Sequence, residues 1–590
     1  MPIPVEEIAF TLKHVAGFGE ALAEGVFGDL TEDLVDAVLA EAGRFAENVV
    51  APLDAAGDRV GARFEAGRVT MPPGWRAAYR GWAEGGWAGL AAPVGVGGQG
   101  LPVSLELAAF EIWNSASLAF ALGPVLSIAA IEALAAHATP ELRDLYAPRL
   151  VSGEWTGTMN LTEPQAGSDL SAIRTRAEPA ADGSFRLFGE KIFITYGEHD
   201  LADNIVHLVL ARLPDAPAGT KGLSLFVVPK LLVAADGSLG APNDVACRSI
   251  EAKLGLHASP TCVMGYGDRG EGAVGHLVGE PHSGLKCMFT MMNTARLHIG
   301  LQGVATAEMA ARRAAAYAGE RRQGRAPGHA GGGPSRIVEH PDVRRMLLRM
   351  RALAAASRAI CHTCAVAIDL SQRAAPELRG AWHERAALLT PVAKAFATDA
   401  GVEAASLAIQ VHGGMGFIEE TGIARYLRDV RIAPIYEGTN GIQAIDLVTR
   451  KLPMSDGSAV NALIGELRET AGRTEAADRL DLGRCGVRIG EAVDALSAAT
   501  ACLLDGLGDR RMATALAAAT PYLRLFGLTL GGALLAKAAL VGGEAPAAAR
   551  RAVLARFFAE DLLPEAAALA VVVVTGGGAV LAATDEMLAE

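Results

Sequence analysis

A chain of 590 residues is too long for one hydrophobic core and predicts several domains. Hydrophobic residues make up 51% of it and aromatic residues only 5%, so small aliphatic side chains dominate, which favours packed helices. A net charge of −13 argues against a nucleic-acid-binding surface.

Three features bear on the cellular compartment. Residues 1–7 lack the basic and apolar regions of a signal peptide. Seven cysteines in so long a chain do not suggest a disulfide framework, so we expect a reducing cytoplasm. The longest uncharged run, 566–583, is rich in Ala and contains three consecutive glycines. It predicts a buried helix and turn rather than a stable membrane span.

The first 155 residues have a mainly helical pattern. Thr31, followed by two acidic residues, is typical of a helix start, and apolar residues then recur at helical spacing. The run Gly95–Gly100 superficially resembles a dinucleotide-binding loop. It follows only a weak strand and no second strand ending in an acid comes after it, so we expect an interhelical loop.

Residues 156–285 predict a β domain inserted between helical blocks. Short runs rich in β-branched and aromatic residues are separated by turn residues. The runs are 184–188, 191–195, 205–210 and 223–228.

Residues 286–452 return to a helical pattern, apart from a Gly- and Pro-rich loop at 324–334, and 453–590 form a further helical block rich in Ala and Leu. Cys361 and Cys364 have CxxC spacing, but no second pair exists and the surroundings are helical. Buried thiols are the preferred interpretation, and no metal site is predicted.

The stretch Ala433–Gln443 is central to the interpretation, because Glu437 stands alone as an acid among apolar and small residues. Poor solvation would raise its pKa and make it a better general base beside a cofactor. Thr439 and Asn440 would offer hydrogen bonds to the ligand. A plain helix start, with the acid near the positive end of the helix dipole, explains the stretch equally well.

Two further segments suit a flat polar ring system. Met159–Asp169 offers small residues and hydroxyls at the entrance to the β region, and Lys191–Gly197 offers an aromatic face and a hydroxyl in one strand. Either segment alone is compatible with ordinary turn and strand chemistry.

Four ordered motifs together resemble the acyl-CoA dehydrogenase family. They are Thr162-Glu163-Pro164 with Ala166–Asp169, Ile194-Thr195-x-Gly197, Gln410–Phe417 and Tyr436–Thr439. The resemblance covers roughly residues 36–452. It implies an α+β, mainly α fold with an N-terminal helical domain, a middle β-barrel or sandwich domain and a C-terminal helical bundle, followed here by an extra helical domain. The expected boundaries are 1–35 for an N-terminal extension, then 36–155, 156–285, 286–452 and 453–590.

The resemblance implies FAD-dependent α,β-dehydrogenation of an acyl-CoA thioester to the trans-2-enoyl-CoA. Glu437 would take the α-proton while flavin N5 accepts a hydride from the β-carbon. The flavin ribityl 2′-hydroxyl and the backbone N–H of Glu437 would stabilise the charge that develops on the thioester carbonyl.

The resemblance also assigns binding residues position by position. The cofactor-binding residues would be Leu161, Thr162, Ser168, Phe193, Thr195, Arg321, Gln410, Gly413, Gly414 and Thr439. The substrate-binding residues would be Ser168, Arg296, Tyr436 and Gly438. Arg321, Gln410 and the Gly413–Gly414 turn would reach the FAD of a neighbouring subunit. A solvated basic face is the alternative for Arg321, and Gln323-Gly324 replaces the aromatic residue usual after this arginine.

Length and local sequence resemble a large bacterial subgroup of the family that includes 3-(methylthio)propanoyl-CoA dehydrogenase. The extra block would cover the surface used in tetramers, so a homodimer is expected, with an electron-transferring flavoprotein as electron acceptor. The substrate would be 3-(methylthio)propanoyl-CoA or a short, medium or long fatty acyl-CoA, between which an apolar pocket discriminates poorly. The alternatives are an acyl-CoA oxidase using oxygen and, more remotely, a DNA-binding alkylation-response flavoprotein, which the acidic composition disfavours.

Overall fold

The computed structural model describes residues 2–507, 512–543 and 545–589. Its residues form two compact units. We call Ala40–His298 the sheet unit, and Met1–Leu39 together with Ile299–Glu590 the helical unit. The expected mainly helical α+β fold is confirmed.

The sheet unit combines five helices with twelve strands among the described residues. The helices are α4 (Ala51–Val60), α5 (Trp75–Glu84), α6 (Val103–Ala116), α7 (Leu118–His137) and α8 (Pro140–Val151). The strands are β1 (Arg63–Glu65), β2 (Arg68–Thr70), β3 (Trp155–Asn160), β4 (Arg176–Pro179), β5 (Phe185–Thr195), β6 (Asn204–Arg212), β7 (Leu223–Pro229), β8 (Leu231–Val233), β9 (Leu239–Pro242), β10 (Val245–Ile250), β11 (Thr261–Tyr266) and β12 (Ala273–Val278).

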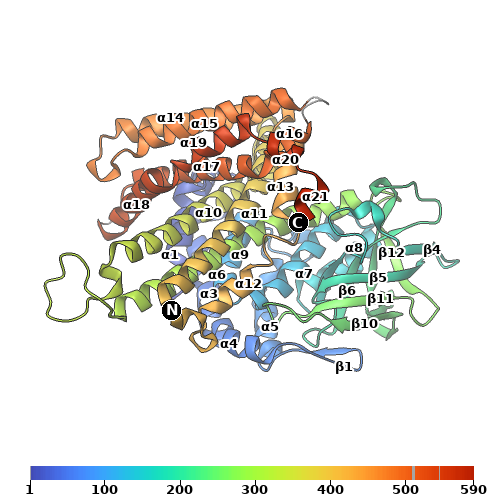
Figure 1. Cartoon of the computed structure of the whole chain (residues 1–590). Helices are drawn as coiled ribbons and strands as arrows, with labels where there is room; N and C mark the ends of the chain where they lie inside the picture. Colours follow the sequence, from blue (N-terminus) through green and yellow to red (C-terminus); the bar gives the residue numbers. More distant parts are fainter. Residues whose placement is uncertain (1, 508–511, 544, 590) are drawn as a thin grey trace. The chain divides into compact units, whose positions relative to one another are not determined.

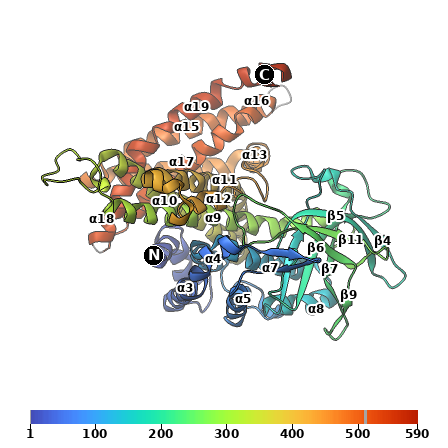
Figure 2. The same ribbon diagram turned by 60° about the horizontal axis from the view of Figure 1, so that its bottom comes forward.

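The main sheet has the strand order β10-β11-β5-β12-β7-β6-β3, with β4 against β5 and β6. Figure 2 labels β4, β5, β6, β7 and β11 of this sheet. Most pairs are antiparallel, but β3 runs parallel to β6. The predicted runs 184–188 and 191–195 are not separate strands, because both belong to β5. The first half of β5 pairs with β12 and the second half with β11. Gly189 joins the halves with φ 153°, where a Cβ would lie 2.5 Å from the hydroxyl oxygen of Thr175.

The helical unit holds the remaining helices, with α3 and α9 straddling its boundaries. They are α1 (Val5–Phe10), α2 (Phe18–Ala23), α3 (Glu32–Phe45), α9 (Gly284–Glu320), α10 (Pro341–Arg373), α11 (Pro376–His412), α12 (Ala424–Val430), α13 (Asn440–Asp446), α14 (Ser458–Ala476), α15 (Cys485–Gly506), α16 (Met512–Ala517), α17 (Ala519–Leu540), α18 (Ala545–Phe557), α19 (Glu565–Thr575), α20 (Gly578–Ala582) and α21 (Asp585–Ala589).

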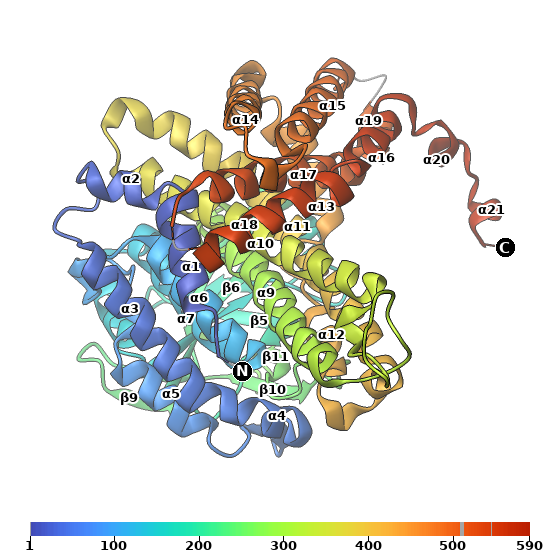
Figure 3. The ribbon, with the colours of Figure 1, turned by 90° about the vertical axis from the view of Figure 1, so that its left-hand side faces the viewer.

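The long helices α10 and α11 pack along each other, and the helices after residue 453 pack on them through α17 (Figure 1). Helix α17 also contacts α13, the first helix after the Glu437 segment. The π-helical turn η1 (Thr11–Val15), near the N-terminus, packs on both α10 and α17, and Figure 3 shows α1 beside α18. The N-terminal residues and the C-terminal helices therefore belong to one helical layer of this unit.

Several local predictions are confirmed. Helix α3 begins at Glu32, and the Thr31 hydroxyl accepts the N–H of Leu34 at 3.3 Å. Gly95–Gly100 lies in a loop before α6, and both thiols of the CxxC pair are buried on α10. The burial predicted for 566–583 is wrong in part, because α20 has no buried residue and projects from its neighbours in Figure 3.

Three described helices, α7, α10 and α17, are long and apolar enough to cross a membrane by length and composition. Between 83% and 89% of the most apolar window of each is buried inside the protein. Their apolar character is therefore accounted for by packing in a hydrophobic core.

Candidate active site

Glu437 lies in a tight loop between α12 and α13, and we call Pro434–Thr439 the Glu437 loop. Glu437 is half-buried and has φ 55°, and Gly438 follows with φ 86°. A residue with a Cβ adopts this left-handed conformation at a cost of about 1 kcal/mol or more unless its surroundings enforce it. The backbone thus carries strain at the one acid of the loop.

Asn440 fixes the C-terminal end of the Glu437 loop to α11. Its backbone N–H donates to the carbonyl oxygen of Pro434 at 2.9 Å, which closes the loop. Its side-chain oxygen accepts from the Lys394 ammonium at 2.8 Å, while its amide nitrogen donates to the Asp399 carboxylate at 2.8 Å and to Thr398 Oγ1 at 3.0 Å. Asn440 is expected from the sequence to hydrogen-bond a ligand, whereas in the structure α11 engages its amide.

Two more side chains brace the loop. The Gln443 amide donates to the carbonyl oxygen of Gly438 at 3.1 Å. The Tyr436 hydroxyl donates to Oε1 of Gln302 on α9. Burial, assisted by the nearby Glu437 carboxylate, raises the pKa of Tyr436 far above its ordinary value, so the phenol remains a hydrogen-bond donor.

A helix does start beside Glu437, as the alternative interpretation requires, but Thr439 provides its cap. Helix α13 begins at Asn440, and the Thr439 hydroxyl accepts the N–H of Ile442 at 3.2 Å. The first turn of α13 contains no acidic residue, so Glu437 lies outside it. The Glu437 side chain is thus not needed to cap the helix.

Within the sheet unit, strand β5 presents Phe193 through a β-bulge. Lys191 pairs with Met264 and Ile194 with Cys262, so two residues of β5, Ile192 and Phe193, oppose one residue of β11. Phe193 has φ 59°, and its ring is 58% exposed, an unusual state for an aromatic residue within a strand. Bulges of this kind re-aim a side chain out of the regular alternation of a strand.

The segment before the bulge is tied to it by backbone and side-chain bonds. The N–H of Ile192 donates to the carbonyl oxygen of Thr162 at 2.9 Å, and the Lys191 ammonium donates to that of Leu161 at 2.9 Å. The structure therefore brings Leu161 and Thr162 beside Phe193. Thr195 lies at the end of the same strand, paired with Thr261.

A buried ion pair lies under this segment. The Lys191 ammonium is 2.9 Å from Glu163 Oε1, and the two side chains are 0% and 3% exposed. Glu163 also accepts the N–H groups of Arg174 and Thr175 at 2.7 and 3.0 Å. Burial opposes ionisation of Glu163, but the Lys191 charge and these hydrogen bonds outweigh it and lower its pKa to about 2. Burial also lowers the pKa of Lys191, to about 8, against the effect of Glu163.

The two expected CoA-facing residues of the sheet unit differ in their surroundings. Ser168 is exposed in the turn before the 3₁₀ turn η5 (Leu170–Ala172). Arg296 is half-buried on α9, with its guanidinium carbon 5.7 Å from the centre of the Phe289 ring.

The ends of α9 and α11 meet in the helical unit. The rings of Tyr317 and His412 stack with centroids 4.3 Å apart. Arg321 is exposed one turn after Tyr317, and Gln410 and Gly413–Gly414 are exposed on either side of His412. The structure thus brings the predicted residues for the adenosine half of the cofactor to one end of this helix pair.

The residues present in each unit fit the parts of FAD that the resemblance assigns to them. Phe193 is exposed in a bulge, Thr162 is bonded through its backbone to the neighbouring Ile192, and Thr195 ends the same strand. An exposed aromatic ring near such polar residues suits a planar polar ring. A Cβ at Gly413 or Gly414 would meet no atom within 4 Å, so the backbone there is open to a phosphate or nucleoside.

Sequence reasoning missed Gln302, Lys394 and the role of the Glu163–Lys191 pair. Glu163 stands inside a quoted motif, and Lys191 begins another, but only the long-range pairing of strand and loop shows that they meet. One signal could have found Lys394: it stands in an apolar stretch of a predicted helix, and it is buried in the structure. A buried lysine nearly always has a polar or charged partner.

Comparisons with known proteins identify the family of the chain. Four family descriptions match the chain: Acyl-CoA dehydrogenase, N-terminal domain (33–154), middle domain (158–268) and C-terminal domain (282–452), and Acetyl-CoA dehydrogenase C-terminal like (463–584). The chain is 44% identical to 3-methylmercaptopropionyl-CoA dehydrogenase of Ruegeria pomeroyi over 556 residues, 92% of each chain, and 34% identical to a butyryl-CoA dehydrogenase of Syntrophomonas wolfei, over 78% of this chain and 77% of that one.

A solved acyl-CoA dehydrogenase of Bacillus anthracis, complexed with FAD, has the same fold. Its TM-score is 0.74 at 21% identity, over 95% of this chain and 90% of that one. The sequence matches extend through both units and the C-terminal helices. The chain therefore belongs to the acyl-CoA dehydrogenase family of FAD-dependent oxidoreductases, in the large bacterial subgroup with an added C-terminal helical block.

Proposed function

We propose that Glu437 is the base that removes the α-proton of the acyl-CoA thioester in this FAD-dependent dehydrogenase. The observation that carries the proposal is the strained, three-fold braced backbone at Glu437, the only acid in its loop. Such strain persists at functional sites because the surrounding structure enforces it. Bound FAD supplies the acceptor for the β-hydride at its N5 atom.

The other residues of the Glu437 loop would orient the substrate. The backbone N–H of Glu437 would donate to the thioester carbonyl oxygen, where negative charge develops as the α-proton leaves. Because Gln302 engages the Tyr436 hydroxyl, Tyr436 would contact substrate with its ring. Gly438, without a side chain, would let the thioester approach the backbone.

The cofactor contacts divide between the units. Leu161, Thr162, Phe193 and Thr195 would hold the isoalloxazine ring, and Thr439 would reach FAD with its hydroxyl hydrogen, since its oxygen already caps α13. Arg321, Gln410, Gly413 and Gly414 would bind the adenosine half of a neighbouring subunit's FAD. Ser168 would serve both the cofactor and CoA, and Arg296 would bind CoA.

We infer that the substrate is 3-(methylthio)propanoyl-CoA or a fatty acyl-CoA of similar length. The Ruegeria pomeroyi relative, at 44% identity, is named for the first and the Syntrophomonas wolfei relative for the second. A thioether sulfur and a methylene differ little in an apolar pocket, where one methylene changes specificity by about 1–3 kcal/mol. Both substrates therefore belong in the test.

We further infer a cytoplasmic homodimer that passes electrons to an electron-transferring flavoprotein and does not insert stably into a membrane. The exposed apolar residues Met415, Phe417 and Ile418, beside Gly413–Gly414, support a covering subunit. The chain would be divided into an N-terminal extension (1–35) and four domains, at 36–155, 156–285, 286–452 and 453–590. A mass of four chains in light scattering would contradict the dimer.

The decisive experiment follows flavin bleaching without oxygen. Purified protein is mixed with C4 to C16 acyl-CoAs and with 3-(methylthio)propanoyl-CoA, and Glu437→Gln is compared with Glu420→Gln, a control at an exposed acid of the same unit. Glu437→Gln should retain FAD and bleach at least ~1,000-fold more slowly, since the general base is gone. Normal bleaching by Glu437→Gln would remove it from the mechanism.

The same preparation separates dehydrogenase from oxidase. The family and the relatives named above are dehydrogenases, so reoxidation should require an added acceptor. Substrate-dependent oxygen consumption at the rate of bleaching would instead favour the oxidase.

A further inference from the structure

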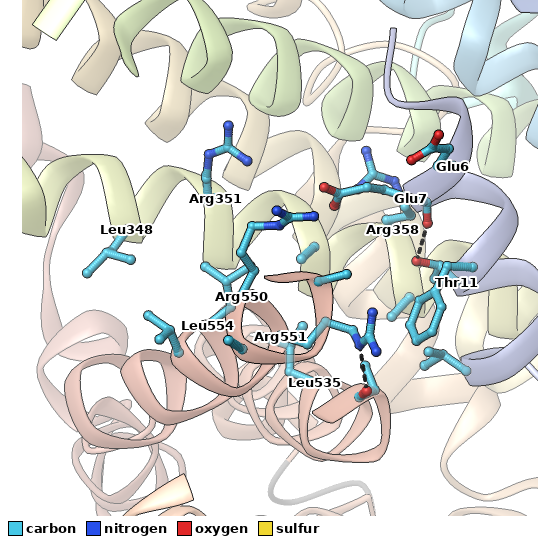
Figure 4. Close-up of a pocket in the computed structure, with 18 residues that line it drawn as sticks. Glu6, Glu7, Thr11, Leu348, Arg351, Arg358, Leu535, Arg550, Arg551 and Leu554 are labelled. Carbon is cyan, nitrogen blue, oxygen red and sulfur yellow. Dashed lines mark hydrogen bonds between the residues drawn. The ribbon is translucent and has the colours of Figure 1, made fainter. Parts of the chain in front are cut away.

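A pocket lies within the helical unit, and neither Glu437 nor any expected cofactor-binding residue lines it. It has a volume of about 640 Å³ and is formed by the N-terminal residues together with α10, α17 and α18 (Figure 4). This volume lies in the range of about 300–1,000 Å³ that small-molecule sites occupy. Only the N-terminal wall precedes the residues that the family descriptions match, which begin at residue 33.

Apolar side chains contribute to the pocket lining from each of its four walls. Phe10 and Val15 contribute from the N-terminal segment, Leu348 from α10, Leu535 from α17, and Val553 and Leu554 from α18. In Figure 4 Leu535 and Leu554 lie below the guanidinium groups of Arg351 and Arg358, whereas Leu348 lies beside Arg351 on α10. An apolar wall of this kind suits a hydrocarbon chain.

The charged lining is unbalanced. Four arginines and two glutamates line the pocket, which leaves a net charge of +2 in a protein whose net charge is −13. A local positive potential within an acidic protein favours an anionic ligand. The glutamates, Glu6 and Glu7, both belong to α1.

Two of the arginines have structural roles. Arg551 donates to the carbonyl oxygens of Ala538 and Gly542, both at 3.1 Å, near the end of α17, and its guanidinium lies 4.0 Å from the centre of the Phe10 ring. Arg358 is buried and lies 3.4 Å from the Glu308 carboxylate. These contacts hold the N-terminal segment and α9 around the pocket.

The other two arginines, Arg351 and Arg550, are available to a ligand. Neither has an ion pair within 4.0 Å or a hydrogen bond among the residues that the structure describes. Arg351 is half-buried on α10, and Arg550 is exposed on α18. Guanidinium groups bind carboxylates and phosphates through paired hydrogen bonds.

We propose that this pocket binds an anionic amphiphile, a hydrocarbon chain that ends in a carboxylate or a phosphate monoester. Arg351 and Arg550 bind the head group, and the chain lies against Leu348, Leu535 and Leu554. The site is separate from the dehydrogenation chemistry and does not depend on the role of Glu437. Because its walls join the N-terminal segment to the C-terminal helices, a bound ligand would also link these two parts.

Calorimetric titration of the full-length, FAD-loaded protein tests the proposal. The probes are decanoate, decyl phosphate, neutral decanol and inorganic phosphate. At least one of the two chain-bearing anions should bind, and it should bind ~10-fold or more tightly than both decanol and inorganic phosphate. Which of the two binds better identifies the head group. Binding of neither, or equal binding of decanol, would overturn the proposal.

Variants locate the binding. Arg351→Gln and Arg550→Gln should each weaken binding about 10-fold and the double variant about 100-fold, whereas Arg473→Gln, an exposed control on α14, should not. Ala355→Phe, placed in the pocket wall, should block the chain while keeping both charges. Unchanged binding in the double variant and in Ala355→Phe would place the ligand elsewhere, including the acyl-CoA site, and would refute the inference. Bleaching by acyl-CoA, measured in the same variants, should remain unchanged, so failure here is distinct from failure of the Glu437 proposal.

Discussion

Two buried lysines support candidate site residues, one in each unit, and their charges are neutralised differently. In the sheet unit, Lys191 meets the Glu163 carboxylate directly at 2.9 Å beneath the Phe193 bulge. In the helical unit, Lys394 and Asp399 meet through the side chain of Asn440, which accepts from one and donates to the other. The first arrangement is an ion pair and the second is an amide bridge.

The difference has opposite consequences for the two carboxyl groups. The pKa of Glu163 is lowered to about 2, because the Lys191 charge and several hydrogen bonds outweigh its burial. The pKa of Asp399 is raised by burial, which the Asn440 hydrogen bond and more distant cations offset only in part. The two carboxyl groups also differ in exposure, because Glu163 is buried whereas Asp399 is exposed to solvent. The ion pair should control the stability of its segment, whereas the amide bridge should control the position of the Glu437 loop.

Lys191→Met should produce the largest effect on stability. It leaves the buried Glu163 carboxylate without its counter-charge, which typically costs about 3–5 kcal/mol. Urea unfolding followed by circular dichroism should show the loss, and flavin content should fall with it. The double variant Glu163→Gln with Lys191→Met removes both charges and should recover at least half of the loss. A single variant as stable as wild type would show that the pair is not the main support of this segment.

Acid should break the Glu163–Lys191 ion pair between pH 4.5 and about pH 2. Because the pKa of Glu163 is lower in the folded protein than its ordinary value of 4.5, its ionised form stabilises the fold fully above pH 4.5, and this contribution is lost as the pH falls toward 2. At pH 3 the loss should reach about 2 kcal/mol. The contribution of Asp399 has the opposite sign, because its pKa is raised rather than lowered in the folded protein.

The control for this window is the double variant without either charge. Its free energy of unfolding should change less than that of wild type between pH 4.5 and pH 3. Parallel pH profiles for the two proteins would assign the acid sensitivity to other carboxyl groups.

Asn440→Ala should lower kcat rather than unfold the protein. The Glu437 loop would lose its anchor on α11, and a misplacement of about 1 Å at a reacting group can cost roughly 100-fold in rate. We expect kcat to fall 10- to 100-fold with a smaller change in KM, and flavin content to stay near one per chain. Asn461→Ala, at an exposed position on α14, is the matched control. A raised KM with normal kcat would indicate that Asn440 binds substrate after all.

The local features of the candidate site could be predicted from the sequence, but the long-range contacts that hold them in place could not. A capped helix start at Thr31, the strand runs and the isolated acid at 437 depend on local composition and were visible. The union of two runs into β5 and the bulge at Phe193 depend on pairing with β11, some seventy residues away, and leave no local signal.

Polar residues near the site were the hardest to interpret, because a side chain next to a ligand-binding loop can face the ligand or the protein. Asn440 resembled a ligand contact and instead bridges Lys394 and Asp399. Apolar composition misled at the other end of the chain: a buried helix and turn were expected over 566–583, yet α20 has no buried residue. In both cases the outcome depends on which other segments a residue contacts in the folded protein. Local composition does not determine those contacts.

Two substitutions of Phe193 separate the contribution of its ring from that of its strained backbone. They should have the smallest effect of the changes proposed in the sheet unit. Phe193→Ala removes the exposed ring but keeps a Cβ in the left-handed conformation, whereas Phe193→Gly removes the ring and relieves the backbone. If the ring stacks on flavin, both variants should weaken FAD binding by a similar factor, about 5- to 13-fold, as expected for the loss of about 1–1.5 kcal/mol of aromatic contact. The Gly variant should unfold at higher urea than the Ala variant, by roughly 1 kcal/mol. FAD binding measured by flavin fluorescence decides between the contributions: a weakening confined to Phe193→Gly would mean that the rigid bulge, rather than the ring, holds the cofactor.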